Sequence, residues 1–275
     1  MTTPAVDTAN RHRSELLAMI AVATSRLTAV WQRLTDGQGS LLRRLARLRQ
    51  RTSKAIRAAV AEFNGVVAAF DRDARSLAER WVATDLPTAY RDGALRALEA
   101  ARADIRRFSW TTDHQAALTA ITAVYWADLI RRITEAVRRA QAFARAAAEA
   151  ARRPEGVDAD ALAVEHPLDA VVYANQRRHP VAAWAASAFA AQAATTANRG
   201  AVNTGVLDLG VEWFECTDGP ECGFVSHEDP DHASGTLRSA DEAAAYPIAH
   251  PGCIRQWTPR PDLTGRTDIE DGDSA

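Results

Sequence analysis

The chain is poor in the residues that build disulfide-stapled or membrane-spanning proteins. It contains 3 cysteines, which cannot all pair with one another, among 275 residues. No stretch of about 18 continuous apolar residues occurs, and the nearest candidate, residues 181–197, is mostly alanine and contains Gln192. We therefore expect no membrane span. Since no signal peptide is recognisable, we also expect a reducing compartment that keeps the thiols unpaired.

Lysine is nearly absent as well, because Lys54 is the single lysine among 33 basic residues. Together with the abundant alanine, this ratio indicates a strong genomic G+C bias rather than a chemical requirement. The choice of arginine over lysine therefore carries little functional information. The hydrophobic content of 47% nevertheless allows one large or two smaller domains with packed cores.

Familiar catalytic signatures are missing too. The sequence has no G-x-S-x-G elbow, no P-loop, no H-E-x-x-H helix and no paired glutamate motif. We therefore expect a protein that is not an enzyme.

The net charge of −2 conceals an uneven distribution. Residues 1–153 hold 26 Lys and Arg against 15 Asp and Glu, a net charge of +11. Residues 154–275 hold 7 against 20, a net charge of −13. The basic half is a candidate for contact with nucleic acid or with an acidic protein surface.

The most basic segment is Ser40–Arg57, which contains no acidic residue. At helical spacing Arg43, Arg47 and Arg51 project in one row, which predicts a contact with phosphates or with an acidic partner. The alternative is the solvated face of an ordinary amphipathic helix. The segment has no aromatic residue, so we do not expect bases of a single strand to stack on it.

Helical patterns dominate the first 200 residues and predict a mainly α fold. The turn residues Asp36–Ser40 are expected to break the helical pattern once. Pro87 suits a first helical turn, and Thr111 is placed to cap the helix that follows. The expected helices cover about residues 10–34, 41–82, 87–108, 111–152, 168–178 and 181–198.

Arg153–Gly156 is the expected domain boundary, because turn residues coincide there with the change of charge sign. Beyond residue 207 the pattern changes to short strands, loops and one small helix near Ser239. The predicted organisation is a basic helical domain over residues 1–153, an acidic linker and helix pair over 154–206, a small α+β module over 207–262, and a disordered acidic tail over 263–275.

The α+β module holds all three cysteines. Cys216 and Cys222 are followed, after 27 residues, by His250 and Cys253. Three thiolates and an imidazole suit tetrahedral zinc, and the turn residues after Cys216 can bring the first two sulfurs together. The spacing therefore predicts a structural zinc that staples a module with little apolar core. The alternatives are three thiols without a ligand, or one disulfide with a free thiol.

Two further histidines, His227 and His232, lie in the acidic loop between the ligand pairs. Either could replace a cysteine as a metal ligand or be a solvated loop residue. With Asp229 or Asp231 they could also surround an open metal position. A metal-dependent nuclease or hydrolase is therefore an alternative function.

The sequence around the cysteines resembles a known family. The resemblance rests on the runs Val211-Glu-Trp-Phe-Glu-Cys216, Cys222-Gly-Phe-Val-Ser-His227 and Tyr246-Pro-Ile-Ala-His-Pro-Gly-Cys253. Residues 207–260 are similar to the C-terminal module of phage minor head proteins, the Mu F-like head morphogenesis family. That pattern closes with His-Pro-x-Cys, a basic residue and, in one form, another cysteine. Here Ile254 precedes Arg255 and no further cysteine follows, which favours His250 as a ligand.

The resemblance implies a zinc-binding, structural minor capsid protein of a bacteriophage virion that acts in head morphogenesis. It implies a place at the portal or in the capsid interior, with the host cytoplasm as the site of assembly. The implied partners are portal and capsid proteins, and packaged DNA through the basic half. A DNA-binding accessory protein that uses Ser40–Arg57 is a further alternative.

Overall fold

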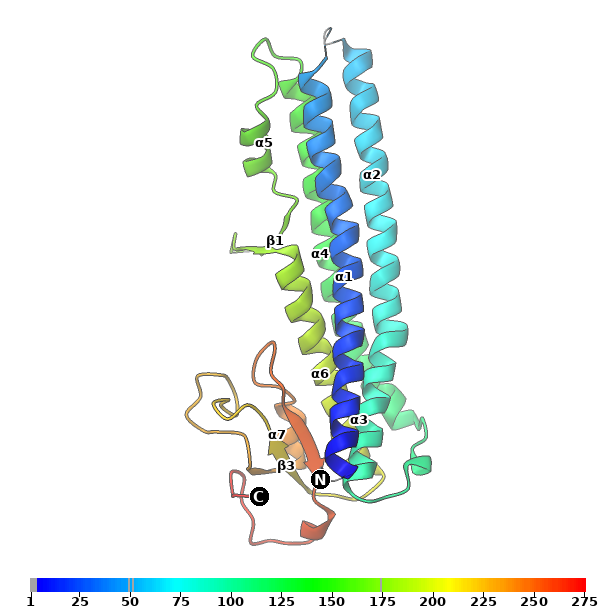
Figure 1. The fold of residues 1–275 in the computed structure, drawn as a ribbon, viewed down its shortest axis with the longest axis vertical. Coiled ribbons are helices and arrows are strands. Elements are labelled where there is room, and N and C mark those ends of the chain that lie inside the picture. The colour runs from blue at the N-terminus through cyan, green and yellow to red at the C-terminus, as the bar shows by residue number, and fades with distance from the viewer. Residues whose placement is uncertain (1–3, 49, 51, 174) are drawn as a thin grey trace. The chain divides into compact units, whose positions relative to one another are not determined.

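The structure, a computed structural model, describes residues 4–48, 50, 52–173 and 175–275, with side chains from residue 14 onward. The described chain is mainly helical and has a small sheet region near its C-terminal end (Figure 1). The predicted fold class, a mainly α chain with a small C-terminal α+β module, is confirmed. Within these residues, no helix combines the length and the hydropathy that crossing a membrane requires.

The elements lie along the chain in the following order, and the longest connection joins β3 to β4. They are α1 (Pro4–Ala46), α2 (Ser53–Arg80), the π-helical turn η1 (Trp81–Asp85), α3 (Leu86–Ala100), η2 (Ile105–Arg107), α4 (Thr112–Ala150), α5 (Ala159–Glu165), β1 (Ala170–Val172), β2 (Arg178–Pro180), α6 (Val181–Leu207), β3 (Trp213–Thr217), β4 (Leu237–Ser239), α7 (Ala240–Ala245), β5 (Gln256–Pro259) and η3 (Pro261–Leu263).

Residue contacts divide the chain into two compact units. The first unit contains the residues up to 22, residues 81–125 and residues 186–275, and the second contains residues 23–80 and 126–185. This division differs from the predicted boundary at Arg153–Gly156, because residues on both sides of that boundary pack with residues 23–80.

The second unit is a helical bundle in which α1, α2 and α4 run side by side (Figure 1). Trp31 on α1 meets Phe70 on α2 edge to face, with ring centroids 5.0 Å apart. Phe63 and Phe143 make a similar contact between α2 and α4, at 5.4 Å. The buried residues of α2 recur every three or four positions, as expected for a helix with one apolar face: Ile56, Ala59, Phe63, Val67, Phe70, Ala74 and Ala78.

The predicted break at Asp36–Ser40 is wrong, because α1 continues through it to Ala46. Gly37 serves packing there: a Cβ at this position would lie 2.9 Å from Cγ1 of Val66 on α2. A glycine inside a helix can thus mark a close helix contact rather than a turn. The helical pattern is interrupted between α1 and α2 instead, so the predicted helix over residues 41–82 is two helices.

The predicted helix over residues 168–178 is also wrong. This segment forms the β1–β2 hairpin, in which Val171 pairs with His179. Its β-branched residues Val171 and Val172 favour extended backbone. The indole N–H of Trp31 donates to the carbonyl oxygen of Leu168 at 2.9 Å. The cap predicted at Thr111 is present, because its hydroxyl accepts from the amide of His114, and the hydroxyl of Ser239 caps α7 by accepting from the amide of Glu242.

In the first unit, α3 and α6 cross with their backbones in contact. A Cβ built on Gly93 would lie 1.8 Å from the carbonyl oxygen of Ala197. A Cβ on Gly200 would lie 2.0 Å from that of Tyr90. Glycine is the residue that permits such an approach at both positions.

A buried polar chain begins beside this crossing. The Tyr90 hydroxyl accepts from the Asn203 amide at 2.8 Å and lies 2.9 Å from Nδ1 of His114. Nε2 of His114 lies 3.3 Å from the Asp208 carboxylate. A carboxylate accepts, so Nε2 carries the proton and Nδ1 accepts from the tyrosine hydroxyl. Burial raises the pKa of Tyr90 to about 12, which keeps this hydroxyl a donor.

The C-terminal module of the first unit is built on a three-stranded antiparallel sheet in the order β4-β3-β5. Phe214 and Cys216 of β3 and Trp257 of β5 form its core with Phe224 and Ala243. The side-chain amide of Asn198 on α6 donates to the carbonyl oxygens of Pro247 and Arg255, at 2.7 and 2.8 Å. These bonds hold the loop before β5 against α6.

Residues 263–275, for which the sequence predicts a disordered acidic tail, make backbone contacts with β4. The amide of Gly272 donates to Leu237 at 2.9 Å, and that of Leu237 donates to Asp273 at 2.7 Å. The Asp271 carboxylate accepts from the amide of Ser239 at 2.6 Å. This segment therefore covers the outer edge of β4, an arrangement that its acidic composition does not reveal.

Candidate metal centre

Three of the four predicted zinc ligands lie together in the C-terminal module. The ligand atoms of Cys222, His250 and Cys253 are all within 4.8 Å of one another, a group that could hold a metal ion. Sγ of Cys222 lies 3.2 Å from Nε2 of His250. Nδ1 of His250 lies 3.0 Å from the carbonyl oxygen of Pro251. Because a carbonyl only accepts, Nδ1 carries the proton and Nε2 presents its lone pair to the cluster.

A tight turn brings His250 and Cys253 together. The amide of Cys253 donates to the carbonyl oxygen of His250 at 3.0 Å, and Gly252 has a φ of 89°. Proline followed by a glycine with positive φ is typical of a type II turn. Cys222 is placed in a comparable way, because its amide donates to Gly219 at 2.9 Å. A local turn therefore sets the backbone at each ligand, and the close approach of Cys222 to His250 comes from the fold of the module.

Cys216 lies outside this group. It sits in the middle of β3, paired with Trp257 of β5, and its side chain belongs to the hydrophobic core. Burial raises the pKa of its thiol to about 12, so the thiol stays neutral. The structure thus brings together three of the predicted ligands and gives Cys216 a packing role.

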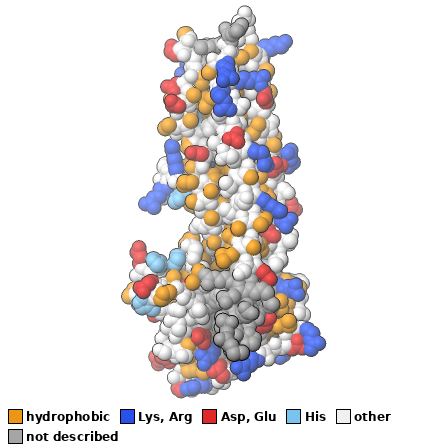
Figure 2. Space-filling view, viewed as in Figure 1, with side chains coloured by type: hydrophobic (Ala, Val, Ile, Leu, Met, Phe, Trp, Pro, Cys, Tyr) orange, Lys and Arg blue, Asp and Glu red, His pale blue; other side chains and the backbone are white. Residues whose placement is uncertain are grey.

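Of the two alternate ligands, His227 lies beside the cluster. Its ring centroid is 4.9 Å from that of His250. His232 instead takes part in a backbone bridge with Gly223 and is exposed. Histidine and acidic side chains gather at the surface over the loops beside α7 (Figure 2).

The loop that carries His227 is tightly folded. Asp229 accepts from the amides of Val225 and Asp231, at 2.9 and 3.1 Å, and these bonds hold the pKa of its carboxyl below the usual range. A Cβ on Gly223 would lie 2.2 Å from the carbonyl oxygen of Ser226, so this position needs glycine. Asp229 therefore closes a turn next to Cys222.

An ion pair between Asp218 and Arg255 supports the cluster from inside the module. Nε of Arg255 lies 2.9 Å from the Asp218 carboxylate, and 0% of either side chain is exposed. The Cys253 thiol donates to the same carboxylate at 3.2 Å. The remaining guanidinium nitrogens of Arg255 donate to backbone carbonyls of three residues: Gly223, Phe224 and Tyr246.

Sequence reasoning missed this pair. The sequence places Asp218 only among the turn residues after Cys216, and Ile254 separates Arg255 from the last cysteine. The structure explains the spacing. Ile254 is exposed, and Arg255, one residue further on, is buried next to β5. An unpaired buried charge is very costly, so a buried arginine requires an acidic partner such as Asp218.

The charge around Cys222 bears on metal binding. Burial, with Asp218 and Cys253 nearby, raises the pKa of the Cys222 thiol to about 11. The Cys222 thiol therefore keeps its proton at neutral pH until a cation stabilises the thiolate.

The predicted phosphate contacts lie on the second unit. Arg43 and Arg47 are exposed, one turn apart at the end of α1, and Arg51 lies outside the described residues. Arg44, beside them, forms an ion pair with Glu62. A contact of this row with nucleic acid or protein remains a prediction.

Comparisons with protein-family models, with curated proteins and with solved structures give no match to this chain. Its function is therefore argued from the residues and their geometry.

Metal content tests the cluster directly. The purified protein is expected to bind about one metal ion per chain, and Cys222→Ser or Cys253→Ser is expected to abolish binding, since each removes one of the three grouped ligands. Cys216→Ala is the matched control and should keep the metal. Atomic emission after dialysis provides the measurement. Loss of metal from the Cys216→Ala protein alone, or a protein that takes up none, would contradict the assignment.

Proposed function

We propose that this chain is a structural minor head protein of a bacteriophage, with a C-terminal module stapled by zinc. The observation that carries the proposal is the His250–Cys253 turn, whose two ligands join Cys222 within 4.8 Å. This turn is the most specific part of the resemblance to the Mu F-like head morphogenesis family.

In this proposal the metal stabilises the fold of the C-terminal module. Cys222 and His250 are 28 residues apart, and a shared ion would close the loop between them. The module has a small hydrophobic core, so a metal would contribute folding energy that the core lacks. Asp218 would orient the Cys253 sulfur, because Arg255 fixes its carboxylate.

In this proposal the helical, basic part of the chain contacts the portal, the capsid interior or the packaged DNA. The support is its net charge of +11 and the exposed arginines at the end of α1. Long-range attraction of this kind weakens as salt is added.

Head incorporation tests this function. In heads assembled with the phage's own portal and capsid proteins, the chain is expected to copurify with the particles. A Cys222→Ser variant is expected to be lost from them, because the module that needs its metal unfolds. Cys216→Ala should be incorporated at the wild-type level. Particles that assemble with normal composition and never contain the chain would rule out the proposal.

A second candidate is a metal-dependent hydrolase, and one observation favours it. The cluster gathers three ligands rather than four, and catalytic zinc sites keep one position open for water. His227, beside His250, would then act on that water. Zinc-dependent nicking of supercoiled DNA, lost in His227→Ala with the metal retained, would select this candidate over the structural one.

A further inference from the structure

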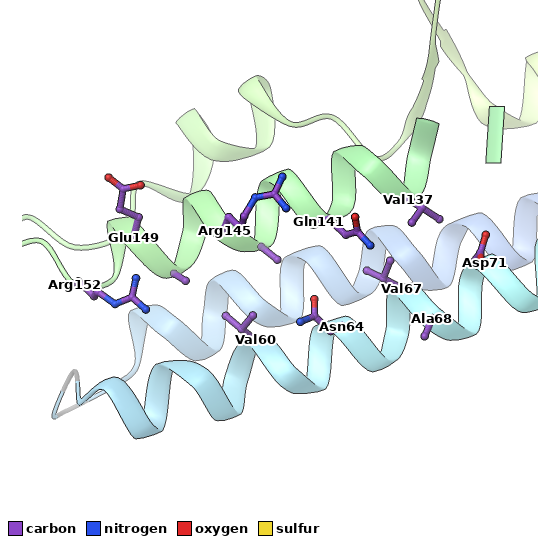
Figure 3. A pocket seen from close by; sticks show the side chains of 12 residues that line it. Val60, Asn64, Val67, Ala68, Asp71, Val137, Gln141, Arg145, Glu149 and Arg152 are labelled. Carbon is purple, nitrogen blue, oxygen red and sulfur yellow. The ribbon is translucent and has the colours of Figure 1, made fainter. Parts of the chain in front are cut away.

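A groove runs between α2 and α4 in the second unit (Figure 3). It encloses about 750 Å³ and extends from Val60 to Asp71 on α2 and from Val137 on α4 to Arg152, which lies in the turn after α4. At a rise of 1.5 Å per residue, the α2 side is roughly 17 Å long, which matches about three turns of a further helix. Nothing in the predicted metal chemistry uses this groove.

The lining of the groove combines an apolar floor with polar edges. Val67 and Ala144 are buried, and further valine and alanine side chains extend the apolar surface along both helices. Asn64, Gln141 and Arg145 are exposed on its edges (Figure 3). An apolar stripe between polar edges is the surface into which an amphipathic helix packs.

The charge of the edges is unbalanced. Both acidic residues of the lining already have partners: Asp71 pairs with Arg75, and Glu149 pairs with Arg153. Within the part of the chain that the structure describes, the side chains of Arg145 and Arg152 form no ion pair or hydrogen bond. Two uncompensated positive charges therefore face the groove at its α4 edge.

We propose that this groove docks an amphipathic helix of a partner protein whose flanks carry acidic residues. Apolar side chains of the partner would cover the half-buried Val60 and Val137, and its carboxylates would pair with Arg145 and Arg152. The amides of Asn64 and Gln141 would bond to polar side chains along the same flanks. This proposal stands on the groove alone and does not require the role in head assembly.

Two other occupants fit the lining less well. Duplex DNA binds through its phosphates, which gain nothing from a floor of valine and alanine. In a dimer with a two-fold axis, the groove of one copy would face the groove of the other. Two concave surfaces cannot fill one another. The apolar floor and the free arginines together favour an acidic helix.

The test uses the full chain and two synthetic peptides of three or more helical turns. Both carry leucine at every third or fourth position, and their other positions are glutamate in one and lysine in the other. The glutamate peptide is expected to shift the methyl NMR signals of Val60, Val67 and Val137. The lysine peptide should bind at least about tenfold more weakly, since it places like charges beside Arg145 and Arg152.

Charge-matched variants complete the test. Replacing Arg145 and Arg152 together by glutamine is expected to lower the affinity for the glutamate peptide roughly threefold to tenfold. A loss of this size is expected when two exposed ion pairs are removed. The same replacement at Arg131 and Arg138, elsewhere on α4, should leave its affinity unchanged. Equal binding of both peptides, or equal loss in both variants, would overturn the proposal. So would the same valine shifts produced by duplex DNA, or a dimer in sedimentation that buries these valines.

Discussion

Replacing Arg255 with leucine is expected to unfold the C-terminal module at ambient temperature. The change leaves the Asp218 carboxylate buried without its counter-ion and removes the donor from the carbonyls of Gly223, Phe224 and Tyr246. Removing one partner of a buried ion pair costs about 3–5 kcal/mol. Hydrogen exchange of the β3 and β5 amides measures this loss in the module itself.

The matched control is Arg260→Leu. Arg260 pairs with Glu215 and Asp262 while a quarter of its side chain is exposed, so its loss should cost no more than about 1 kcal/mol. Combining Asp218→Asn with Arg255→Leu should cost less than the sum of the two single changes, because each removes the charge that the other leaves unpaired. Additive losses, or an Arg255→Leu protein as stable as the control, would show that the pair contributes little.

Gly200→Ala is expected to destabilise the first unit by at least about 3 kcal/mol, at the upper end of the cost of overpacking. The added methyl would lie 2.0 Å from the carbonyl oxygen of Tyr90, and a backbone atom cannot turn aside as a flexible side chain can. α3 and α6 would have to separate, and this would also pull Asn203 away from Tyr90. Urea denaturation followed by circular dichroism provides the measurement.

Gly65→Ala is the control for this substitution. Gly65 also lies in a helix, but a Cβ there meets nothing within 4 Å. The same change should therefore stabilise α2 by about 0.5–1 kcal/mol. Similar effects at Gly65 and Gly200 would mean that helix propensity, rather than the close contact of two backbones, decides the outcome.

The contrast between a glycine in open space and a glycine at a close helix contact also explains how much of this fold the sequence predicts. The long helices follow from apolar residues at three- and four-residue spacing, and the helix around Phe63 and Phe70 is present, although it begins at Ser53 rather than at Leu41. The predicted helix break at Asp36–Ser40 is wrong because glycine occurs both in turns and at close helix contacts. Only the position of Val66, on another helix, decides between them.

In the metal centre, the residue types predicted three of the ligands, but the predicted pairing of the first two sulfurs is wrong. Cys222, His250 and Cys253 come together as expected, whereas the turn residues after Cys216 do not bring its sulfur into the group. Cys216 has the same residue type but a strand position that buries it in the core. Asp218 and Arg255 are 37 residues apart, and nothing in their spacing reveals that they meet.

The turn that holds His250 and Cys253 has a consequence for the loop before it. Two of the three candidate ligands are fixed by four consecutive residues, so the position of the third depends on how the intervening chain closes on itself. The free-energy cost of closing a loop grows slowly with its length: doubling the number of residues adds only about 0.6 kcal/mol. Lengthening the exposed stretch between His227 and Asp229 would therefore add little closure entropy, and its cost would come instead from the hydrogen bonds that Asp229 makes with the amides of Val225 and Asp231.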